Sequence, residues 1–281
     1  MLKLTLATLS FIVSTTLFVG AHDEFSKPDI KLETKLDAKG KNVYYMYIDG
    51  IKVHETNPAI QSQPVVVTPS SVVGKAPSDA IVLFDGSPES FANWTDTKGG
   101  TTKWKLIDGI MESVKKAGYI QTKQSFGSCQ LHIEWASPKI AKGDGQKRGN
   151  SGLFLQGTYE IQILDCYENP TYPDGQAGAL YGRKKPLVNS CRKPGEWQSY
   201  DVIFHRPIFG DKGKVIKRAT FTVLHNGVLI QDHEELSGAT HWRGPHAVHG
   251  YAAHPDKLPI KLQDHGNPVR FRNIWIRELE D

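Results

Sequence analysis

The stretch ATFTVLHNGVLIQD, residues 219–232, carries the clearest folding signal in the chain. Two runs of mainly apolar and β-branched side chains flank Asn226 and Gly227 at its centre. Asn-Gly favours the two-residue turn of a β-hairpin, because both positions of that turn need a positive φ. The stretch therefore predicts two antiparallel strands joined by a tight turn.

Strand signals of the same kind recur from about residue 78 to the end of the chain. WKLIDGIMESV (residues 104–114) predicts a second hairpin, with Asp108 and Gly109 at its turn. CQLHIEWASP (129–138) alternates, with Leu131, Ile133 and Trp135 on one side. Further strand patterns are AIVLFDG (80–86), SGLFLQG (151–157), YEIQILD (159–165), QSYDVIFH (198–205) and NPVRFRNIWIREL (267–279). Because helix signals are nearly absent, the fold class is all-β, a sandwich or jelly roll.

Composition narrows the function classes. The chain has 281 residues, 39% of them hydrophobic, and a formal net charge of +4. The charges are dispersed and no basic run is dense enough to indicate nucleic-acid binding. Aromatic residues make up 10% and include six Trp, which suits either a sandwich core or a sugar-stacking surface.

The first 21 residues, MLKLTLATLSFIVSTTLFVGA, predict a secretory signal peptide. One positive charge at Lys3 precedes an uncharged apolar run, which ends in the small-residue pattern Val19-Gly20-Ala21. We therefore expect an exported protein, periplasmic or extracellular. No later segment has eighteen consecutive apolar residues, so we expect no membrane span after cleavage.

Residues 22–77 are expected to form an N-terminal extension. NVYYMYIDGIKVHE (42–55) predicts a short hairpin that turns at Asp49 and Gly50. NPAIQSQPVVVTPSSVVGKAPSD (57–79) is rich in Pro, Ser and Val, which indicates either an extended segment laid over the surface or a linker. The main domain is then residues 78–281.

Three cysteines are present, and export permits disulfides. Cys166 follows the YEIQILD strand, and Cys191 precedes the next strand signal. A Cys166–Cys191 bridge would close the long loop between them, which stabilises by about 3 kcal/mol for a loop of that size. Cys129 lies in a strand pattern, where a buried free thiol is expected.

The strand within TYEIQILD (158–165) separates two kinds of side chain. Tyr159, Ile161 and Ile163 share one face, which we expect to be core, while Glu160 and Gln162 share the other. In a sandwich, the second face is either plain surface or the floor of a groove.

Several motifs together resemble one known family. AIVLFDG, LHIEW, GNSGLFLQGTYEIQILD, DGQAGALYG, PGEWQSYDVIFHRP and LQDHGNPVRFRNIWIREL occur in this order. Over residues 78 to 280 the chain resembles the 3-keto-disaccharide hydrolases, also described as 3-keto-glucoside 1,2-lyases and 3-keto-2-hydroxy-glucal hydratases. The resemblance implies a concanavalin-like jelly roll, similar to laminarinase-type glycoside hydrolases. Those enzymes place paired carboxylates on one concave strand, and Gln162 departs from that pattern.

The resemblance implies an exported carbohydrate-active enzyme that cleaves 3-keto-glycosides. A keto group at C3 of the sugar acidifies the C2 proton, so that a base removes it, the C1 substituent is eliminated and water adds. This chemistry needs a general base, an electrophile at the C3 oxygen and an acid for the leaving group. A divalent metal ion is a possible cofactor in the electrophilic role.

The predicted site residues fall into two groups. The catalytic residues, which are also the candidate metal ligands, are Glu160, Glu134 and His265. The substrate-binding residues are Gln162, Gln156, Tyr181, Asp174, Gln176 and Arg272. Structural roles stay open for several of them, such as a surface acid for Glu134 or a cross-strand salt bridge for Arg272. A cluster of His241, His246, His249 and His254 matches no standard metal site.

Two other functions stay open on the sequence. A non-catalytic carbohydrate-binding module can share the same sandwich. A conventional glycoside hydrolase would need two carboxyl groups, and the Gln162 position argues against it.

Overall fold

The computed structural model describes residues 29–36, 39–48, 51–55, 67–241 and 250–281. The chain divides into two compact units, residues 1–66 and 67–281. The predicted signal peptide, residues 1–21, lies outside the described residues and stays a prediction. The predicted start of the main domain at residue 78 lies a short way inside the second unit.

The first unit holds a three-stranded antiparallel sheet in the order β1–β2–β3. Its strands are β1 (Ile30–Leu36), β2 (Asn42–Ile48) and β3 (Ile51–Glu55). The strands β2 and β3 pair as the sequence predicts, although the turn residues 49–50 lie outside the described residues. The prediction missed β1, in which Ile30, Leu32 and Leu36 alternate with charged residues.

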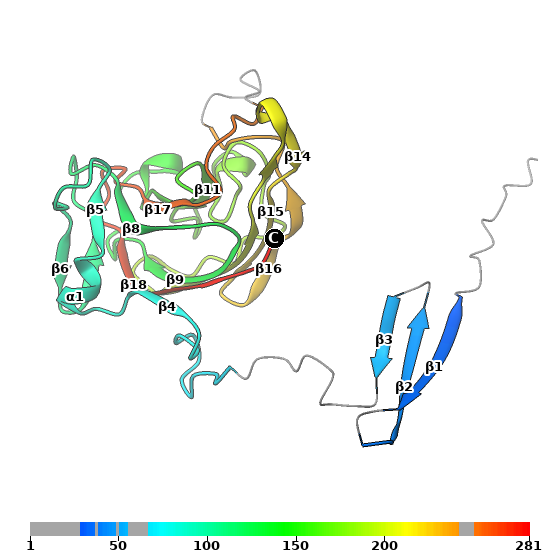
Figure 1. Cartoon of the computed structure of the whole chain (residues 1–281). Helices are drawn as coiled ribbons and strands as arrows, with labels where there is room; N and C mark the ends of the chain where they lie inside the picture. The colour runs from blue at the N-terminus through cyan, green and yellow to red at the C-terminus, as the bar shows by residue number, and fades with distance from the viewer. Residues whose placement is uncertain (1–28, 37–38, 49–50, 56–66, 242–249) are drawn as a thin grey trace, which may run out of the picture. The chain divides into compact units, whose positions relative to one another are not determined.

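The second unit is a β-sandwich built around two antiparallel sheets (Figure 1). The smaller sheet has five strands in the order β11–β10–β17–β8–β5. These strands are β5 (Trp94–Asp96), β8 (Ile120–Phe126), β10 (Ser151–Leu155), β11 (Tyr159–Ile163) and β17 (Leu258–Leu262).

The larger sheet has eight strands in the order β16–β15–β12–β9–β18–β7–β6, with β4 paired to β18. These are β4 (Ile81–Phe84), β6 (Lys105–Ile107), β7 (Ile110–Glu112), β9 (Cys129–Ala136), β12 (Gln198–His205), β15 (Thr220–His225), β16 (Val228–Glu235) and β18 (Arg270–Glu278). A short ribbon pairs β13 (Ile208–Phe209) with β14 (Val215–Lys217). The helical pieces are α1 (Pro88–Phe91) and the 3₁₀ turns η1 (Gly145–Lys147), η2 (Pro173–Gly175) and η3 (Asp211–Gly213).

Both predicted hairpins of the main domain are confirmed. The strands β15 and β16 turn at Asn226 and Gly227, with φ of 54° and 79°. The strands β6 and β7 turn at Asp108 and Gly109, with φ of 50° and 73°. Positive φ at both central positions is what Asn, Asp and Gly tolerate best.

The core lies between the two sheets. Leu153 and Ile161 of the smaller sheet and Ile133 of the larger sheet are fully buried there. The ring of Tyr159 lies 5.9 Å from that of Phe204 across the interface, measured between centroids. The all-β sandwich predicted from the strand patterns is therefore confirmed.

The segment just before β4 lies against the larger sheet. The Gly74 carbonyl accepts hydrogen bonds from Asn273 Nδ2 (2.7 Å) and Trp275 Nε1 (2.9 Å). Gly74 has a φ of +80°, and a Cβ there would lie 3.5 Å from the His132 ring. This part of the predicted extension is therefore laid over the sandwich surface.

The predicted Cys166–Cys191 disulfide is wrong for this structure, in which both residues are free thiols. The Cys191 thiol instead donates a weak hydrogen bond to the Leu164 carbonyl (Sγ–O 3.9 Å). Its interaction with the neighbouring Cys166 thiol lowers the pKa of Cys166 and, together with burial, raises that of Cys191. The Cys166 sulfur also accepts the Ala177 N–H (3.1 Å), and Asn189 Nδ2 donates to the Cys166 carbonyl (2.9 Å). These hydrogen bonds hold the loop where a disulfide was expected. Cys129 is a buried free thiol, as predicted.

Within the described residues, no helix is long and apolar enough to cross a membrane.

The inter-sheet core gives a first testable prediction. Leu153→Ala leaves a cavity at a fully buried position and should lower the free energy of unfolding by about 2–5 kcal/mol. Ile203→Ala on β12 is the matched control, because that side chain is 40% exposed, and it should cost less than about 1 kcal/mol. Urea unfolding of both variants measures the difference. Equal losses would contradict the assignment of Leu153 to the core.

Candidate active site

Glu160 and Gln162 lie on the face of β11 that points away from the inter-sheet core. Their neighbours Tyr159, Ile161 and Ile163 are buried against the larger sheet. Glu160 is nevertheless only 7% exposed and Gln162 only 1%. Of the two roles that the sequence left open, plain surface is therefore wrong, and other segments must cover this face.

One covering segment runs along the outer edge of β11. The Gln162 N–H donates to the Ala179 carbonyl (2.9 Å), and the Gly178 N–H donates back to the Gln162 carbonyl (2.8 Å). The Tyr181 N–H donates to the Glu160 carbonyl (3.1 Å). Residues 178–181 therefore pair with β11 almost as a further strand, which places Tyr181 beside Glu160.

A pocket of about 510 Å³ opens over this face of the smaller sheet. Segments far apart in the sequence contribute polar or aromatic side chains to it, and Glu160 is the carboxyl group among the described lining residues. The lining residues are Tyr119, Gln146, Asn150, Phe154, Glu160, Gln162, Tyr172, Tyr181, His241, Gln263 and His265. Hereafter we refer to it as the Glu160 pocket.

Burial raises the pKa of Glu160 to about 8. Among the described residues, no hydrogen bond or ion pair reaches its carboxyl group, so little offsets the cost of the charged form. The titratable groups that line the pocket around it are His241, His265 and the three tyrosines. A carboxyl group with such a pKa can take up and release a proton near neutral pH.

Gly152 provides the space that the Glu160 side chain occupies. It lies on β10, where its register partner is Gln162. A Cβ at this position would lie 2.3 Å from Glu160 Oε1 and 2.9 Å from Phe154 Cε2. Any larger side chain at position 152 must therefore displace the carboxyl group.

A chain of amides orients Gln162. Its Nε2 donates to Gln146 Oε1 (2.9 Å), and Gln146 Nε2 donates to the Gly175 carbonyl (2.8 Å). Asn150 Nδ2 donates to the Gln146 carbonyl (2.7 Å). Gln162 Oε1 is buried without a partner in the described part of the chain. It is therefore free to accept a hydrogen bond from a ligand hydroxyl.

Two further pairs of side chains line the pocket. Gln263 Nε2 donates to the Tyr119 hydroxyl (2.5 Å), and the hydroxyls of Tyr172 and Tyr181 are hydrogen-bonded at 2.6 Å. Burial raises the pKa of Tyr181, and the neighbouring Tyr172 adds to this. Tyr181 is therefore a neutral donor at physiological pH. The tyrosine rings also offer flat faces suited to sugar rings.

The structure brings four of the predicted site residues together. Glu160, His265, Gln162 and Tyr181 all line the Glu160 pocket. Asp174 and Gln176 lie in the neighbouring loop but do not line it. The Asp174 carbonyl accepts the Gly182 N–H (2.9 Å), which indicates a structural part for this loop.

Glu134 is far from Glu160 in the fold, and its predicted convergence with Glu160 and His265 is wrong. It lies on β9 of the larger sheet, whereas Glu160 lies on β11 of the smaller one. Its carboxylate pairs with Arg272 Nε (2.6 Å) and accepts from Asn273 Nδ2 (2.7 Å). The alternation of side chains along the strand correctly predicted that Glu134 points away from the core. Alternation does not show to which sheet a strand belongs.

The prediction that Arg272 binds substrate is also wrong. Besides pairing with Glu134, its guanidinium lies 4.1 Å from the centroid of the Trp197 ring. Both contacts belong to the outer face of the larger sheet. The cross-strand salt bridge, the alternative that the sequence left open, is what the structure shows.

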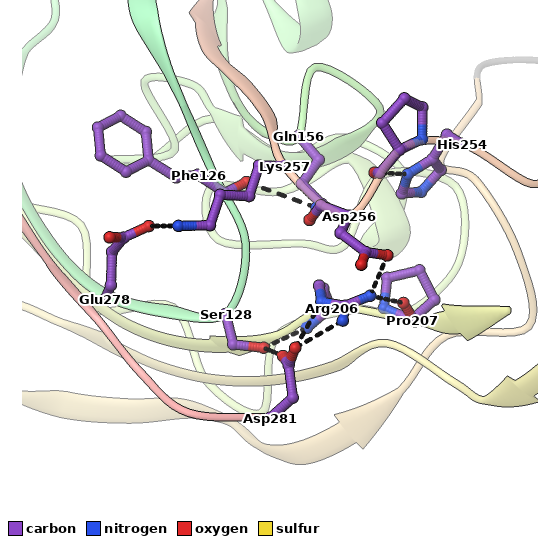
Figure 2. A network of polar contacts seen from close by, with 11 residues as sticks. Phe126, Ser128, Gln156, Arg206, Pro207, His254, Asp256, Lys257, Glu278 and Asp281 are labelled. Carbon is purple, nitrogen blue, oxygen red and sulfur yellow. Dashed lines mark hydrogen bonds and ion pairs between the residues drawn. The ribbon is translucent and has the colours of Figure 1, made fainter.

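Gln156 is a buried structural residue, so its predicted substrate contact is also wrong. It has a positive φ of 50° at the turn between β10 and β11 and is 1% exposed. Its Nε2 donates to the Asp256 carbonyl at 2.6 Å, as Figure 2 shows. The Asp256 carboxylate in turn pairs with Arg206, which also binds Asp281 near the C-terminus. Gln156 therefore helps to fix the segment that leads into β17.

The predicted metal ligands do not form a set. Among the described residues, no three His, Cys, Asp or Glu side chains gather closely enough to hold an ion. His254 is occupied with the Tyr159 hydroxyl (2.8 Å), and His246 and His249 lie outside the described residues. A divalent cofactor stays a prediction, and we derive no step through it.

Sequence reasoning missed Tyr119, Gln146, Asn150, Tyr172 and Gln263 as pocket residues. One signal was present for Gln263, which stands two residues before His265 in the LQDHGNP motif. The others come from loops or strand ends, where alternation does not apply. Their place depends on how distant segments meet, which a local pattern does not encode.

Comparisons with known proteins agree with this fold. A curated 3-keto-disaccharide hydrolase of Bacteroides thetaiotaomicron is 25% identical over 246 residues, which cover 71% of this chain and 78% of that protein. A solved Parabacteroides distasonis protein, provisionally named a glycosyl hydrolase, is 48% identical with a TM-score of 0.73, covering 78% of this chain and 93% of that one. A second structure from that organism, with the same provisional name, is 21% identical with a TM-score of 0.51, covering 72% of this chain and 94% of that one, and is alike in fold.

The model of one protein family matches most of the second unit. It describes the 3-keto-alpha-glucoside-1,2-lyase-like domain, and it matches residues 79–277. That range contains every strand of the two large sheets except the last residue of β18. The resemblance found in the sequence motifs is thereby confirmed: the chain belongs to the 3-keto-alpha-glucoside-1,2-lyase-like domain family.

Proposed function

We propose that this protein is an enzyme that cleaves 3-keto-glycosides by elimination followed by hydration. The observation that carries the proposal is the Glu160 carboxyl group, which is buried in a pocket of amides, tyrosines and imidazoles and is the one carboxyl group among the described residues that line it. Burial raises its pKa to about 8. Family membership supports it, as does the name of the 3-keto-disaccharide hydrolase relative.

The reaction proceeds in two balanced stages. In the first, a base removes the C2 proton, the electron pair forms the C1–C2 double bond, and the C1–oxygen bond to the leaving group breaks. The leaving group departs with a proton, which gives a 3-keto-2-hydroxy-glucal. In the second, water adds across the double bond, with hydroxide at C1 and a proton at C2. The sum is hydrolysis of the glycosidic bond.

Glu160 is the proposed base for the C2 proton. A base is most effective when its pKa lies near the working pH, because it is then partly ionised and still strongly basic. A solvated carboxylate has a pKa near 4.3 and is a poor base for a carbon acid. Burial in the pocket raises the pKa of Glu160 toward the working pH and so makes it a stronger base.

The other lining residues have proposed roles that match their chemistry. His265 is the proton carrier for the leaving group, because an imidazole ring can both donate and accept a proton. The free Oε1 of Gln162 accepts a hydrogen bond from a sugar hydroxyl. Tyr181 donates a hydrogen bond to the keto sugar, where charge develops on the C3 oxygen.

A conventional glycoside hydrolase mechanism has less support. It requires two carboxyl groups, about 5–9.5 Å apart, on either side of the glycosidic bond. Among the described residues, Glu160 is the carboxyl group that lines the pocket, and Glu134 is committed to Arg272 on the other sheet. We also propose that the enzyme acts outside the cytoplasm, on the basis of the signal-peptide pattern in residues 1–21.

Removal of the proposed base tests the mechanism. Glu160→Gln keeps the shape of the side chain and should lower kcat on a 3-keto-glucoside by at least about 10²-fold, since general-base catalysis contributes that much. Glu134→Gln is the matched control on the other sheet and should retain the wild-type rate. Full activity of Glu160→Gln would remove Glu160 from the mechanism.

The same assay on two substrates separates the competing functions. The wild-type protein should cleave a 3-keto-glucoside and leave the unoxidised glucoside intact. Cleavage of the unoxidised glucoside would instead indicate a conventional hydrolase. Binding of both sugars without turnover would indicate a carbohydrate-binding module.

The pKa of Glu160 predicts the pH dependence of the reaction. As a base, Glu160 must be ionised, and its ionised fraction falls about tenfold for each pH unit below its pKa. The kcat/KM value for the free enzyme should therefore rise with pH and level off above about 8. A profile that levels off near pH 5 would show that Glu160 is not buried in the working enzyme.

Gly152 should position the base without touching the substrate. Gly152→Ala puts a methyl group where the Glu160 carboxyl lies, so we expect kcat to fall at least about tenfold, while the thermal unfolding midpoint changes little. Gly250→Ala, at an exposed position with open space around the added Cβ and no positive φ, controls for the general effect of losing a glycine. Unchanged kcat in Gly152→Ala would show that the carboxyl group can move aside without loss.

A further inference from the structure

A second and larger cleft lies next to the Glu160 pocket. Its volume is about 700 Å³, and none of the residues that line it belongs to the Glu160 pocket. Five of its lining residues carry a positive charge: Lys139, Lys142, Lys147, Arg148 and Arg270. We refer to it as the cationic cleft.

Part of the positive charge is balanced within the cleft. Arg148 pairs with Asp165, with Nε and Oδ2 2.9 Å apart. Arg270 lies opposite Glu112 in the ladder between β7 and β18, and its Nη2 donates to the Gly195 carbonyl (3.1 Å). These two guanidinium groups are thus held in place by the protein itself.

The three lysines supply the excess charge. Lys139, Lys142 and Lys147 are exposed, and in the described part of the chain no carboxylate forms an ion pair with any of them. Like charges gathered around one cavity repel each other, and an anion that enters the cavity relieves this repulsion. The cleft is therefore complementary to an anionic group.

A thin ridge separates the cationic cleft from the Glu160 pocket. In the segment 146–150, the first and last residues line the pocket and the three between them line the cleft. In the segment 265–267, His265 faces the pocket while Gly266 and Asn267 face the cleft. The Gly149 N–H donates to Asn267 Oδ1 (3.0 Å) and so joins the two segments.

The ridge is fixed and close-packed. Gly149 has a φ of +58°, and a Cβ there would lie 2.9 Å from Ser137 Cβ and 3.0 Å from Asp165 Cβ. A ligand whose sugar sits over Glu160 can therefore cross one narrow wall to reach the lysines. A substituent of that sugar that extends past the wall would enter the cationic cleft.

We propose that the cationic cleft binds an anionic leaving group, so that the preferred substrates are 3-keto-glycosides whose C1 substituent carries a carboxylate or a sulfate. This inference rests on the proposed function, because the Glu160 pocket must hold the keto sugar. Uronic acids and sulfated sugars share the required chemistry. The test below uses a carboxylate and a sulfonate substrate to distinguish these two kinds of anionic group.

The test compares leaving groups of similar size and different charge. Aryl 3-keto-glucosides with a 4-carboxyphenyl, a 4-sulfophenyl or a neutral 4-carbamoylphenyl group serve as substrates. We expect the wild-type kcat/KM for the better anionic substrate to exceed that for the neutral one about tenfold, since three exposed charges each contribute modestly. A high salt concentration should reduce this preference, because it screens exposed charges.

Two triple variants assign the preference to the cleft. Lys139→Gln, Lys142→Gln and Lys147→Gln together should abolish the preference and leave the rate on the neutral substrate unchanged. Lys98→Gln, Lys123→Gln and Lys214→Gln, which replace exposed lysines outside both cavities, should keep the preference. Equal rates on charged and neutral substrates in the wild type, or a preference that survives the first triple variant, would overturn the proposal.

A binding measurement separates failure of this inference from failure of the proposed function. Calorimetry with the unoxidised 4-carboxyphenyl glucoside needs no turnover. Binding that the first triple variant weakens about tenfold, in a protein that cleaves no keto-glycoside, would support the cleft and reject the enzyme mechanism. Turnover of the keto-glycoside without any charge-dependent binding would support the enzyme mechanism and reject the proposed role of the cleft.

Discussion

The arrangement of this protein depends on the burial of one face of β11 between two sheets. Tyr159, Ile161 and Ile163 are fully or almost fully removed from water there, and burial of each contributes about 1.5–3 kcal/mol. Because side chains alternate along a strand, this burial forces Glu160 and Gln162 onto the opposite face. A slip of one residue would exchange the two sets, which would put a carboxyl group into the apolar core. The core thus fixes where the proposed base points.

Burial of Glu160 outside the core has a cost that the rest of the sandwich must offset. An ionised carboxylate without partners is unstable in a poorly solvated pocket, and the raised pKa expresses that instability. A second carboxylate nearby would raise this pKa further, and a cation would lower it. Gln162, on the same face of β11, provides hydrogen-bonding groups beside Glu160 without a charge that would raise or lower its pKa. The amide that departs from the two-acid pattern therefore suits a lone base.

Much of the fold could be predicted from the sequence, and less of the site. Turn dipeptides such as Asn226-Gly227 and alternating strands such as β9 and β11 have local causes, so the sequence alone gave them correctly. The strands β8 and β17 carry Lys, Gln or Pro among their apolar residues, which hid the pattern. Alternation could tell that Glu134 and Glu160 avoid the core. It could not tell that they lie on different sheets, because sheet order depends on contacts between distant segments.

The ridge between the two cavities also has an electrostatic consequence. Lysines beside Glu160 would stabilise its carboxylate and return its pKa toward the ordinary value, at the expense of basicity. The structure keeps Lys139, Lys142 and Lys147 in a separate cleft, where they are exposed and screened by solvent. Within the ridge segment itself the two cations are Lys147, which is exposed, and Arg148, which Asp165 neutralises. An anionic substituent can thus be attracted on one side of the wall, while proton abstraction proceeds on the other side with a strong base.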